Sequence, residues 1–124
     1  MNKLILLLST LLAGCAQYKC GVMLEIHNQC EIPIHVKLQN FTNGSSNPGD
    51  FVLEPHQTGR AAAYVANYCK LKDVLPDNYQ MTLQSADKSI IFNHEAILER
   101  AQKNTSKTSR DNHYWLLESN DLCK

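Results

Sequence analysis

Residues 21–39 read GVMLEIHNQCEIPIHVKLQ, and in both halves of this stretch an apolar side chain stands at every second position. The alternating apolar residues are Val22, Leu24, Ile26, Ile32, Ile34, Val36 and Leu38. A period of two with one apolar face predicts two half-buried antiparallel strands. The segment NQCE (28–31) between them predicts a hairpin loop, and Pro33 predicts that the second strand begins there or lies at a sheet edge.

Further short strands follow this stretch, separated by turn residues. They are predicted within residues 51–55, 58–68, 79–84, 89–93 and 113–119, and the polar segments 40–50 and 103–112 are predicted loops. Pro55 separates the first two of these strands, and Pro76 with Asp77 supplies a turn before the third.

One helix is expected after Asn93, a residue type that caps helices by accepting a backbone N–H. Glu95 would lie in its first turn and Lys103 in its last, where each charge complements the helix dipole. Ile97, Leu98 and Ala101 would form its apolar stripe. About six to eight strands and one short helix predict a mainly β chain, a small antiparallel β-sandwich.

The length and charge of the chain exclude some classes of function. The 124 residues suffice for one domain. Without Lys3, residues 15–124 carry 11 of the 12 basic side chains and all 12 acidic ones, a net charge of −1. Such a balance gives no overall attraction for phosphate backbones, so no nucleic-acid partner is expected.

The N-terminus has the features of an export signal. Lys3 and the amino terminus form a positive region, and the apolar run LILLLSTLL (4–12) follows. As a helix, this run would reach only about half way across a hydrocarbon core of about 30 Å. It therefore predicts a signal peptide rather than a membrane-spanning helix.

The signal ends in Leu12-Ala13-Gly14-Cys15, which resembles the lipobox of bacterial lipoproteins. The resemblance implies cleavage between Gly14 and Cys15 and attachment of a diacylglycerol to the Cys15 thiol. The acyl chains, palmitate among them, would bind the chain to a lipid bilayer, because each buried methylene contributes about 0.8 kcal/mol. Ala16, in place of an aspartate, implies the outer membrane, with the chain facing the periplasm.

This interpretation divides the chain into three parts. Residues 1–14 are the expected lipoprotein signal peptide, 15–21 a lipidated tether and 22–124 the β-sandwich domain. The alternative is a plain secretory signal on a secreted, disulfide-bonded β protein.

The cysteines indicate an oxidising compartment. If Cys15 carries lipid, four of the five cysteines remain to pair: Cys20, Cys30, Cys69 and Cys123. Cys20 and Cys30 flank a strand and should lie about 25 Å apart, whereas a disulfide needs Cα atoms within about 7 Å. This excludes Cys20–Cys30, and with it Cys69–Cys123, and leaves two pairings open.

Residues 24–58 carry a second, shorter resemblance. LEIHNQCEIPIHV followed by FVLEPHQT is similar to the opening of thaumatin-like β-sandwich proteins, although His56 stands where that family has glycine. The resemblance implies a sandwich opening in which Cys30 pairs with a cysteine near the C-terminus. In this chain the pairs would be Cys30–Cys123 and Cys20–Cys69.

Metal-ligating chemistry has one weak candidate group. In the predicted hairpin, Glu25, His27 and His35 share the outward face, and two imidazoles with a carboxylate suit zinc or copper. Polar residues that share a strand face are more often solvated surface residues than metal ligands, so no metal or cofactor is expected. The other histidines are His56, His94 and His113.

No catalytic motif is present, and the chain is not expected to be an enzyme. The segment NHEAILE (93–99) lacks the second histidine of a His-Glu-x-x-His site, and no nucleophile elbow or phosphate loop occurs. Glycoside hydrolysis would need two acids to meet in space, from among Asp50, Glu54, Asp73 and Asp77. The aromatic residues that could form a recognition patch are Tyr64, Tyr68, Tyr79, Tyr114 and Trp115.

The sequence therefore favours a membrane-anchored envelope lipoprotein that acts as a non-catalytic accessory or adaptor module, with an envelope protein as partner. The alternative is a small periplasmic inhibitor or immunity lipoprotein, for example one directed against a lysozyme.

Overall fold

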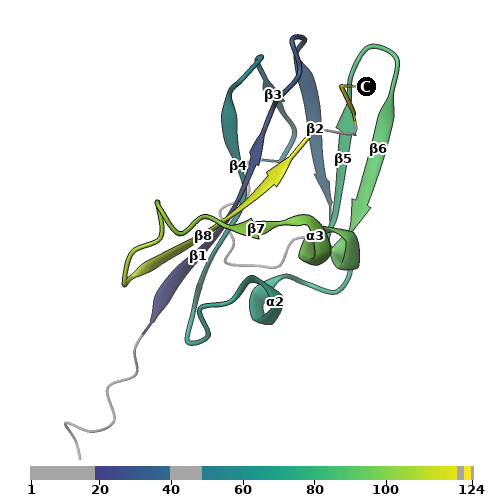
Figure 1. Cartoon of the computed structure of the whole chain (residues 1–124). Coiled ribbons are helices and arrows are strands. Elements are labelled where there is room, and N and C mark those ends of the chain that lie inside the picture. The colour runs from purple at the N-terminus through teal and green to yellow at the C-terminus, as the bar shows by residue number, and fades with distance from the viewer. Residues whose placement is uncertain (1–18, 40–48, 120–121, 124) are drawn as a thin grey trace, which may run out of the picture.

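The computed structural model describes residues 19–39, 49–119 and 122–123. Two four-stranded sheets pack face to face, with the strand orders β4-β1-β8-β7 and β3-β2-β5-β6 (Figure 1). The predicted mainly β sandwich is confirmed. The strands are β1 (Cys20–His27), β2 (Ile34–Gln39), β3 (Phe51–Leu53), β4 (Thr58–Ala66), β5 (Gln80–Gln84), β6 (Ser89–Asn93), β7 (Gln102–Lys103) and β8 (Asn112–Glu118).

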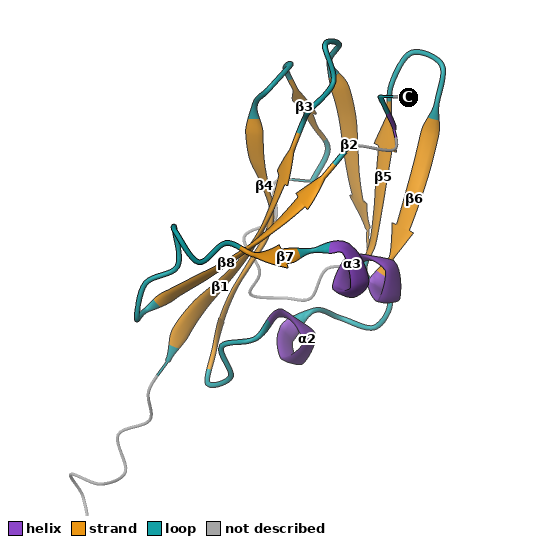
Figure 2. Cartoon of the chain, in the orientation of Figure 1, coloured by secondary structure: helices purple, strands orange, loops and turns teal. Residues whose placement is uncertain are grey.

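Two short helices, α2 (Leu71–Val74) and α3 (His94–Arg100), lie together at one end of the sandwich (Figure 2). The Asn93 cap of α3 is confirmed, because its side-chain oxygen accepts a hydrogen bond from the Ala96 N–H at 2.9 Å. The helix ends at Arg100, so the prediction that Lys103 lies in its last turn is wrong; Lys103 belongs to β7. Helix α2 was not predicted, because four residues are too few for a helical period.

The predicted hairpin of residues 21–39 is wrong. β1 pairs with β4 antiparallel and with β8 in parallel, whereas β2 lies in the other sheet between β3 and β5. The chain therefore crosses from one sheet to the other in residues 28–33. Alternation along a strand shows which side chains share a face, but it carries no information about the neighbouring strand.

The expectation that both strands are half-buried holds for only one of them. β2 alternates between buried and exposed residues, but β1 is buried on both faces, with Met23 7% and Glu25 8% exposed. Lys107, in the loop between β7 and β8, reaches over the outer face of β1. Its Nζ donates to both Glu25 carboxylate oxygens at 3.1 and 3.0 Å and lies 4.5 Å from the centre of the Tyr114 ring.

The core between the sheets is tight enough to require a glycine in β4. A Cβ on Gly59 would lie 2.7 Å from Leu53 Cδ2 and 2.9 Å from Phe51 Cε2, both on β3. Because Gly59 has no side chain, β3 of one sheet approaches β4 of the other closely at this point.

The two disulfides are Cys20–Cys69 and Cys30–Cys123, with Cα atoms 5.9 and 5.1 Å apart, which confirms the implied pairing. They lie at opposite ends of β1, which spans about 26 Å at 3.3 Å per residue. We call the end at which β1 begins the proximal end, and the opposite end the distal end. β1 starts at Cys20, so the predicted tether of residues 15–21 overlaps it by two residues.

Candidate functional site

The distal loops are organised around one buried amide. Asn28 is fully buried; its Nδ2 donates to the carbonyl oxygens of Ile32 at 2.9 Å and Leu53 at 3.1 Å, and its Oδ1 accepts from the Cys30 N–H at 2.8 Å. The β1–β2 connection and the end of β3 are therefore fixed to one side chain, because each of these polar groups would be costly to leave unpaired in the interior.

The turn between β3 and β4 is strained. Within the described residues, His56 is the one non-glycine residue with a positive φ, at 63°. A side chain in this region costs roughly 1–2 kcal/mol. The His56 N–H donates to the Asn28 carbonyl at 2.8 Å, and its Nε2 lies 3.0 Å from Glu31 Oε1. Strain that the surroundings enforce points to a functional loop.

A groove lies beside these loops. Two adjoining hollows of about 490 and 560 Å³ share Ile32 and Ser85 in their linings, and we call them together the distal groove. Ile32 is 44% exposed although it is a large apolar residue. The rest of the lining includes Glu31, Lys88 and both cysteines of the Cys30–Cys123 bridge. The lining therefore mixes apolar and charged side chains beside a disulfide.

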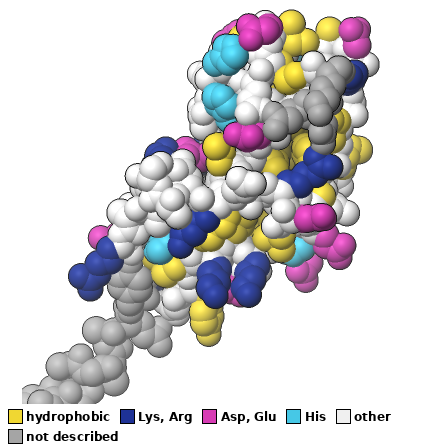
Figure 3. All heavy atoms as spheres, in the orientation of Figure 1, with side chains coloured by type: hydrophobic (Ala, Val, Ile, Leu, Met, Phe, Trp, Pro, Cys, Tyr) yellow, Lys and Arg dark blue, Asp and Glu magenta, His cyan; other side chains and the backbone are white. Residues whose placement is uncertain are grey.

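A second groove, of about 450 Å³, lies at the proximal end, and we call it the proximal groove. Its lining comes from α2, α3, β7 and β8, namely Lys70, Leu71, Lys72, Leu98, Lys103 and Trp115. The Lys103 ammonium lies 5.7 Å from the centre of a Trp115 ring, within reach of a cation–π interaction. Figure 3 shows basic side chains gathered beside apolar ones at the lower end of the molecule.

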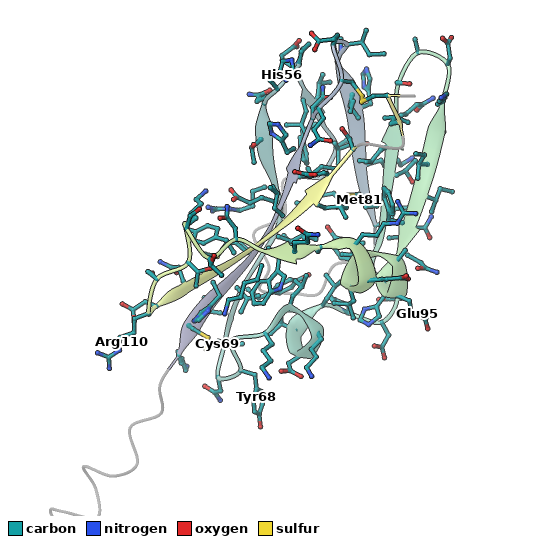
Figure 4. The ribbon with its side chains drawn as sticks, viewed as in Figure 1. His56, Tyr68, Cys69, Met81, Glu95 and Arg110 are labelled. Atoms are coloured by element: carbon teal, nitrogen blue, oxygen red, sulfur yellow. A yellow bond between two sulfur atoms is a disulfide. The ribbon has the colours of Figure 1, made fainter. Side chains whose placement is uncertain are left out.

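The two grooves are at opposite ends of the molecule. Figure 4 shows His56 at one end and Cys69 and Tyr68 at the other. Neither groove was predicted from the sequence. The proximal lining brings together four segments between residues 70 and 115, so no local motif marks it. The distal one has a partial signal, since Asn28 and Cys30 form the Asn-x-Cys of the thaumatin-like resemblance.

The three weak metal candidates do not form one site. The register that grouped them is absent, because Glu25 and His27 lie on β1 and the exposed His35 lies on β2 in the other sheet. Glu25 pairs with Lys107, and His27 Nδ1 lies 2.8 Å from Thr58 Oγ1.

Within the described ranges, the group with suitable spacing for a metal is Cys20, Cys69 and His113, whose ligand atoms lie within 4.8 Å of one another. Its two sulfurs form a disulfide and offer no thiolate to a metal.

The four acids considered for paired carboxylate chemistry are all exposed. Asp50 and Glu54 flank β3, whereas Asp73 lies in α2 and Asp77 lies 3.8 Å from His94 Nε2. Nothing in their surroundings pairs them for acid–base work.

The aromatic residues do not form one patch. Tyr64 and Tyr79 are buried, whereas Tyr68 is 70% exposed. Tyr114 and Trp115 are neighbours on β8 and so point to opposite faces of the sheet. The Tyr79 hydroxyl donates to the Ala61 carbonyl at 2.9 Å, and burial, with a smaller contribution from Tyr64, raises the pKa of Tyr79. Tyr79 is therefore a core residue.

Gly14 and Cys15, the expected cleavage and lipidation positions, lie outside the described residues. No helix in the described part of the chain is long and apolar enough to cross a membrane. Comparison of the chain with protein-family models, curated proteins and solved structures found no match.

Proposed function

We propose that the chain is a lipoprotein of the bacterial outer membrane, anchored through acylated Cys15, whose β-sandwich acts as a non-catalytic adaptor for another envelope protein. The observation that carries the proposal is the use of the cysteines. The two disulfides use Cys20, Cys69, Cys30 and Cys123, and the cysteine that remains is the one in the lipobox.

The short covalent distance between Cys15 and β1 supports a placement of the proximal end near the membrane and of the distal end away from it. The segment from Cys15 to Lys19 reaches at most about 14 Å when fully extended. The proximal end therefore stays close to the lipid, and the distal end lies about 26 Å further along β1. A partner in the periplasm would meet the distal groove first, where Ile32 is exposed and the His56 turn is strained.

The anchor is tested by changing Cys15 to Ser. The expected result is loss of the lipid mass at the N-terminus and accumulation of unprocessed precursor, both read by mass spectrometry of the purified chain. As a companion change, Ala16→Asp should keep the lipid and move the chain to the inner-membrane fraction. Normal processing of the Cys15→Ser chain would refute the anchor.

The adaptor role is tested by placing a photo-crosslinking amino acid at Ile32 in intact cells. Ile91 on β6, 61% exposed, is the matched control because it is also a large apolar residue outside the distal groove. We expect one discrete, stoichiometric protein adduct from position 32 and none from position 91. Equal or absent adducts at both positions would argue against the distal groove as the contact.

The same experiment separates the adaptor from the inhibitor alternative. An adduct with a lysozyme, together with slower lysis when the chain is added to that lysozyme, would assign the distal groove to inhibition. An adduct with a structural or secretory envelope protein, and unchanged lysis, would assign it to the adaptor role.

A further inference from the structure

We propose that the proximal groove binds the headgroups of anionic phospholipids in the membrane that anchors the chain, and that this contact holds the sandwich with its distal end pointing away from the bilayer. The distance argument rests on the lipid anchor proposed above. The chemistry of the groove does not depend on it.

The charge of the proximal groove is uncompensated. Three of its six lining residues are lysines, and none is acidic. Within the described residues, no carboxylate forms an ion pair with Lys70 or Lys72, and Lys103 contacts the Trp115 ring. The three come from two separate segments of the chain, so the fold gathers positive charge at one place. An anionic group is the complementary ligand.

The apolar part of the proximal groove suits the boundary between headgroups and acyl chains. Leu71, Leu98 and Trp115 line the proximal groove together with the three lysines. Tryptophan is enriched at membrane interfaces, because its ring is apolar and its N–H is polar. Lysine side chains cover apolar surface with their stems while the charge stays in the polar layer.

Exposed apolar residues extend this surface. Tyr68 is 70% and Val65 is 76% exposed, although both are large hydrophobic residues. Val65 pairs with Gly21 near the start of β1, and Tyr68 precedes Cys69. Both therefore lie at the end at which β1 begins; Figure 4 shows Tyr68 beside Cys69 at this end.

The path of the chain favours the anchoring membrane over a soluble acidic partner. Cys20, five positions after Cys15, is bonded to Cys69, whose Cα lies 5.9 Å away, and Lys70 follows directly. The first lysine of the proximal groove is thus within a short covalent reach of the lipid. A basic patch at this distance adds an electrostatic attachment to an acyl one.

The test uses Trp115, the one tryptophan in the chain. The full lipidated chain is reconstituted in vesicles of phosphatidylcholine alone, or of equimolar phosphatidylcholine and phosphatidylglycerol, with brominated acyl chains as quenchers. We expect a blue shift and quenching of Trp115 in the anionic vesicles, reversed by high salt. The Lys70→Ala/Lys72→Ala variant should lose this response. Lys37→Ala/Lys88→Ala removes the same charge from exposed sites outside the proximal groove and should keep the response; Lys88 lines the distal groove, whose protein partner is absent from these vesicles.

A second arm separates this inference from the anchor. A chain that begins at Ala16, exported by a plain signal peptide, keeps every described residue and both disulfides. Each lysine near an anionic surface changes partitioning roughly fivefold. The Lys70→Ala/Lys72→Ala form of this chain should therefore partition about 25-fold less onto the anionic vesicles, and the Lys37→Ala/Lys88→Ala form should change far less.

Each outcome of the two arms decides a separate claim. Selective binding by the unanchored chain supports the proximal groove even if Cys15 proves to carry no lipid. Equal losses in the two variants, or no preference for phosphatidylglycerol, would overturn the inference and leave the anchor standing. Binding of a soluble acidic peptide such as polyglutamate, without binding to anionic vesicles, would also overturn it.

Discussion

The distal and proximal ends of the sandwich each carry a disulfide, but they differ in the interactions that organise them. At the distal end the buried side-chain amide of Asn28 forms hydrogen bonds to the loops, and its backbone carbonyl accepts from the N–H of His56 in the strained turn. At the proximal end three lysines, from α2 with its N-cap and from β7, gather in one groove beside Trp115. The first arrangement fixes shape, and the second accumulates charge.

This difference predicts different kinds of recognition. A surface fixed by buried hydrogen bonds discriminates by geometry, and it should be insensitive to salt. A surface that presents several ammonium groups discriminates by charge. Its interactions should weaken as added salt shortens the Debye length below about 10 Å. The changes below are chosen to alter one end while leaving the other intact.

The largest effect is expected from the disulfides. Replacing Cys30 and Cys123 by Ser, or Cys20 and Cys69 by Ser, should lower the free energy of unfolding by about 4 kcal/mol in each case. The distal loss should be the larger by a few tenths, because that bridge closes a sequence separation of 93 residues against 49. Denaturant unfolding of both variants measures the difference. A much larger loss of unfolding free energy in the Cys20/Cys69 variant would contradict the view that this disulfide stabilises the fold only by closing a loop.

The next effect is expected at the centre of the distal end. Asn28→Ala removes three hydrogen bonds and leaves buried carbonyl and N–H groups unpaired, so it should cost roughly 3 kcal/mol. The matched control is Asn78→Ala, at an exposed position, which should cost under about 0.5 kcal/mol. Crosslinking from Ile32 should fall in the Asn28 variant, while the fluorescence of Trp115 should keep its response to anionic vesicles. Loss of both responses would contradict independent ends.

Features that depend on residues close together in the sequence could be predicted, whereas features that depend on contacts between distant residues could not. The core-facing residues of β1 and β2 and the cap of α3 are set locally, and alternation and residue type indicated them correctly. The short turn between β5 and β6 indicated their pairing correctly, but the partners of β1 and β2 were not predictable, because these strands look alike in sequence and lie in different sheets. The burial of Glu25 depends on Lys107, a residue 82 positions away in the chain.

The two grooves were invisible in the sequence for the same reason. Lys70, Lys103 and Trp115 meet only because α2, β7 and β8 fold to one end. The disulfide pairing, in contrast, was narrowed by a distance argument about a single strand. Its final choice came from the resemblance around Cys30.

A smaller effect is expected at Tyr79, a core residue that directly precedes β5 and belongs to neither end of the sandwich. Tyr79→Phe removes the hydrogen bond to the Ala61 carbonyl and should cost about 1 kcal/mol. The folded protein raises the pKa of this phenol, so its contribution to stability is present below the unfolded pKa of about 10 and is lost as the pH rises above it. Above pH 10 the free energy of unfolding should therefore fall less steeply with pH in the variant than in the original chain. Identical slopes of this free energy against pH would contradict the prediction.

The smallest effect is expected at His56. Glycine tolerates a positive φ, so His56→Gly should change stability by under about 1 kcal/mol, in the stabilising direction. Gln57→Gly, at a neighbouring position without positive φ, should instead destabilise by roughly the same amount. Thermal unfolding measures both signs. If the strain serves binding, the His56 variant should also give less adduct from Ile32.

The parallel pairing of β1 with β8 has a consequence for how the chain reaches its folded state. Gly21 pairs with Asn112, so the first strand of the fold has no partner on that side until almost the whole chain is present. Such long-range closure makes folding slow and late, on the scale of milliseconds to seconds. For the lipoprotein proposed above, this late closure predicts that the chain stays unfolded during export, so that Cys15 is open to a modifying enzyme before the sandwich forms.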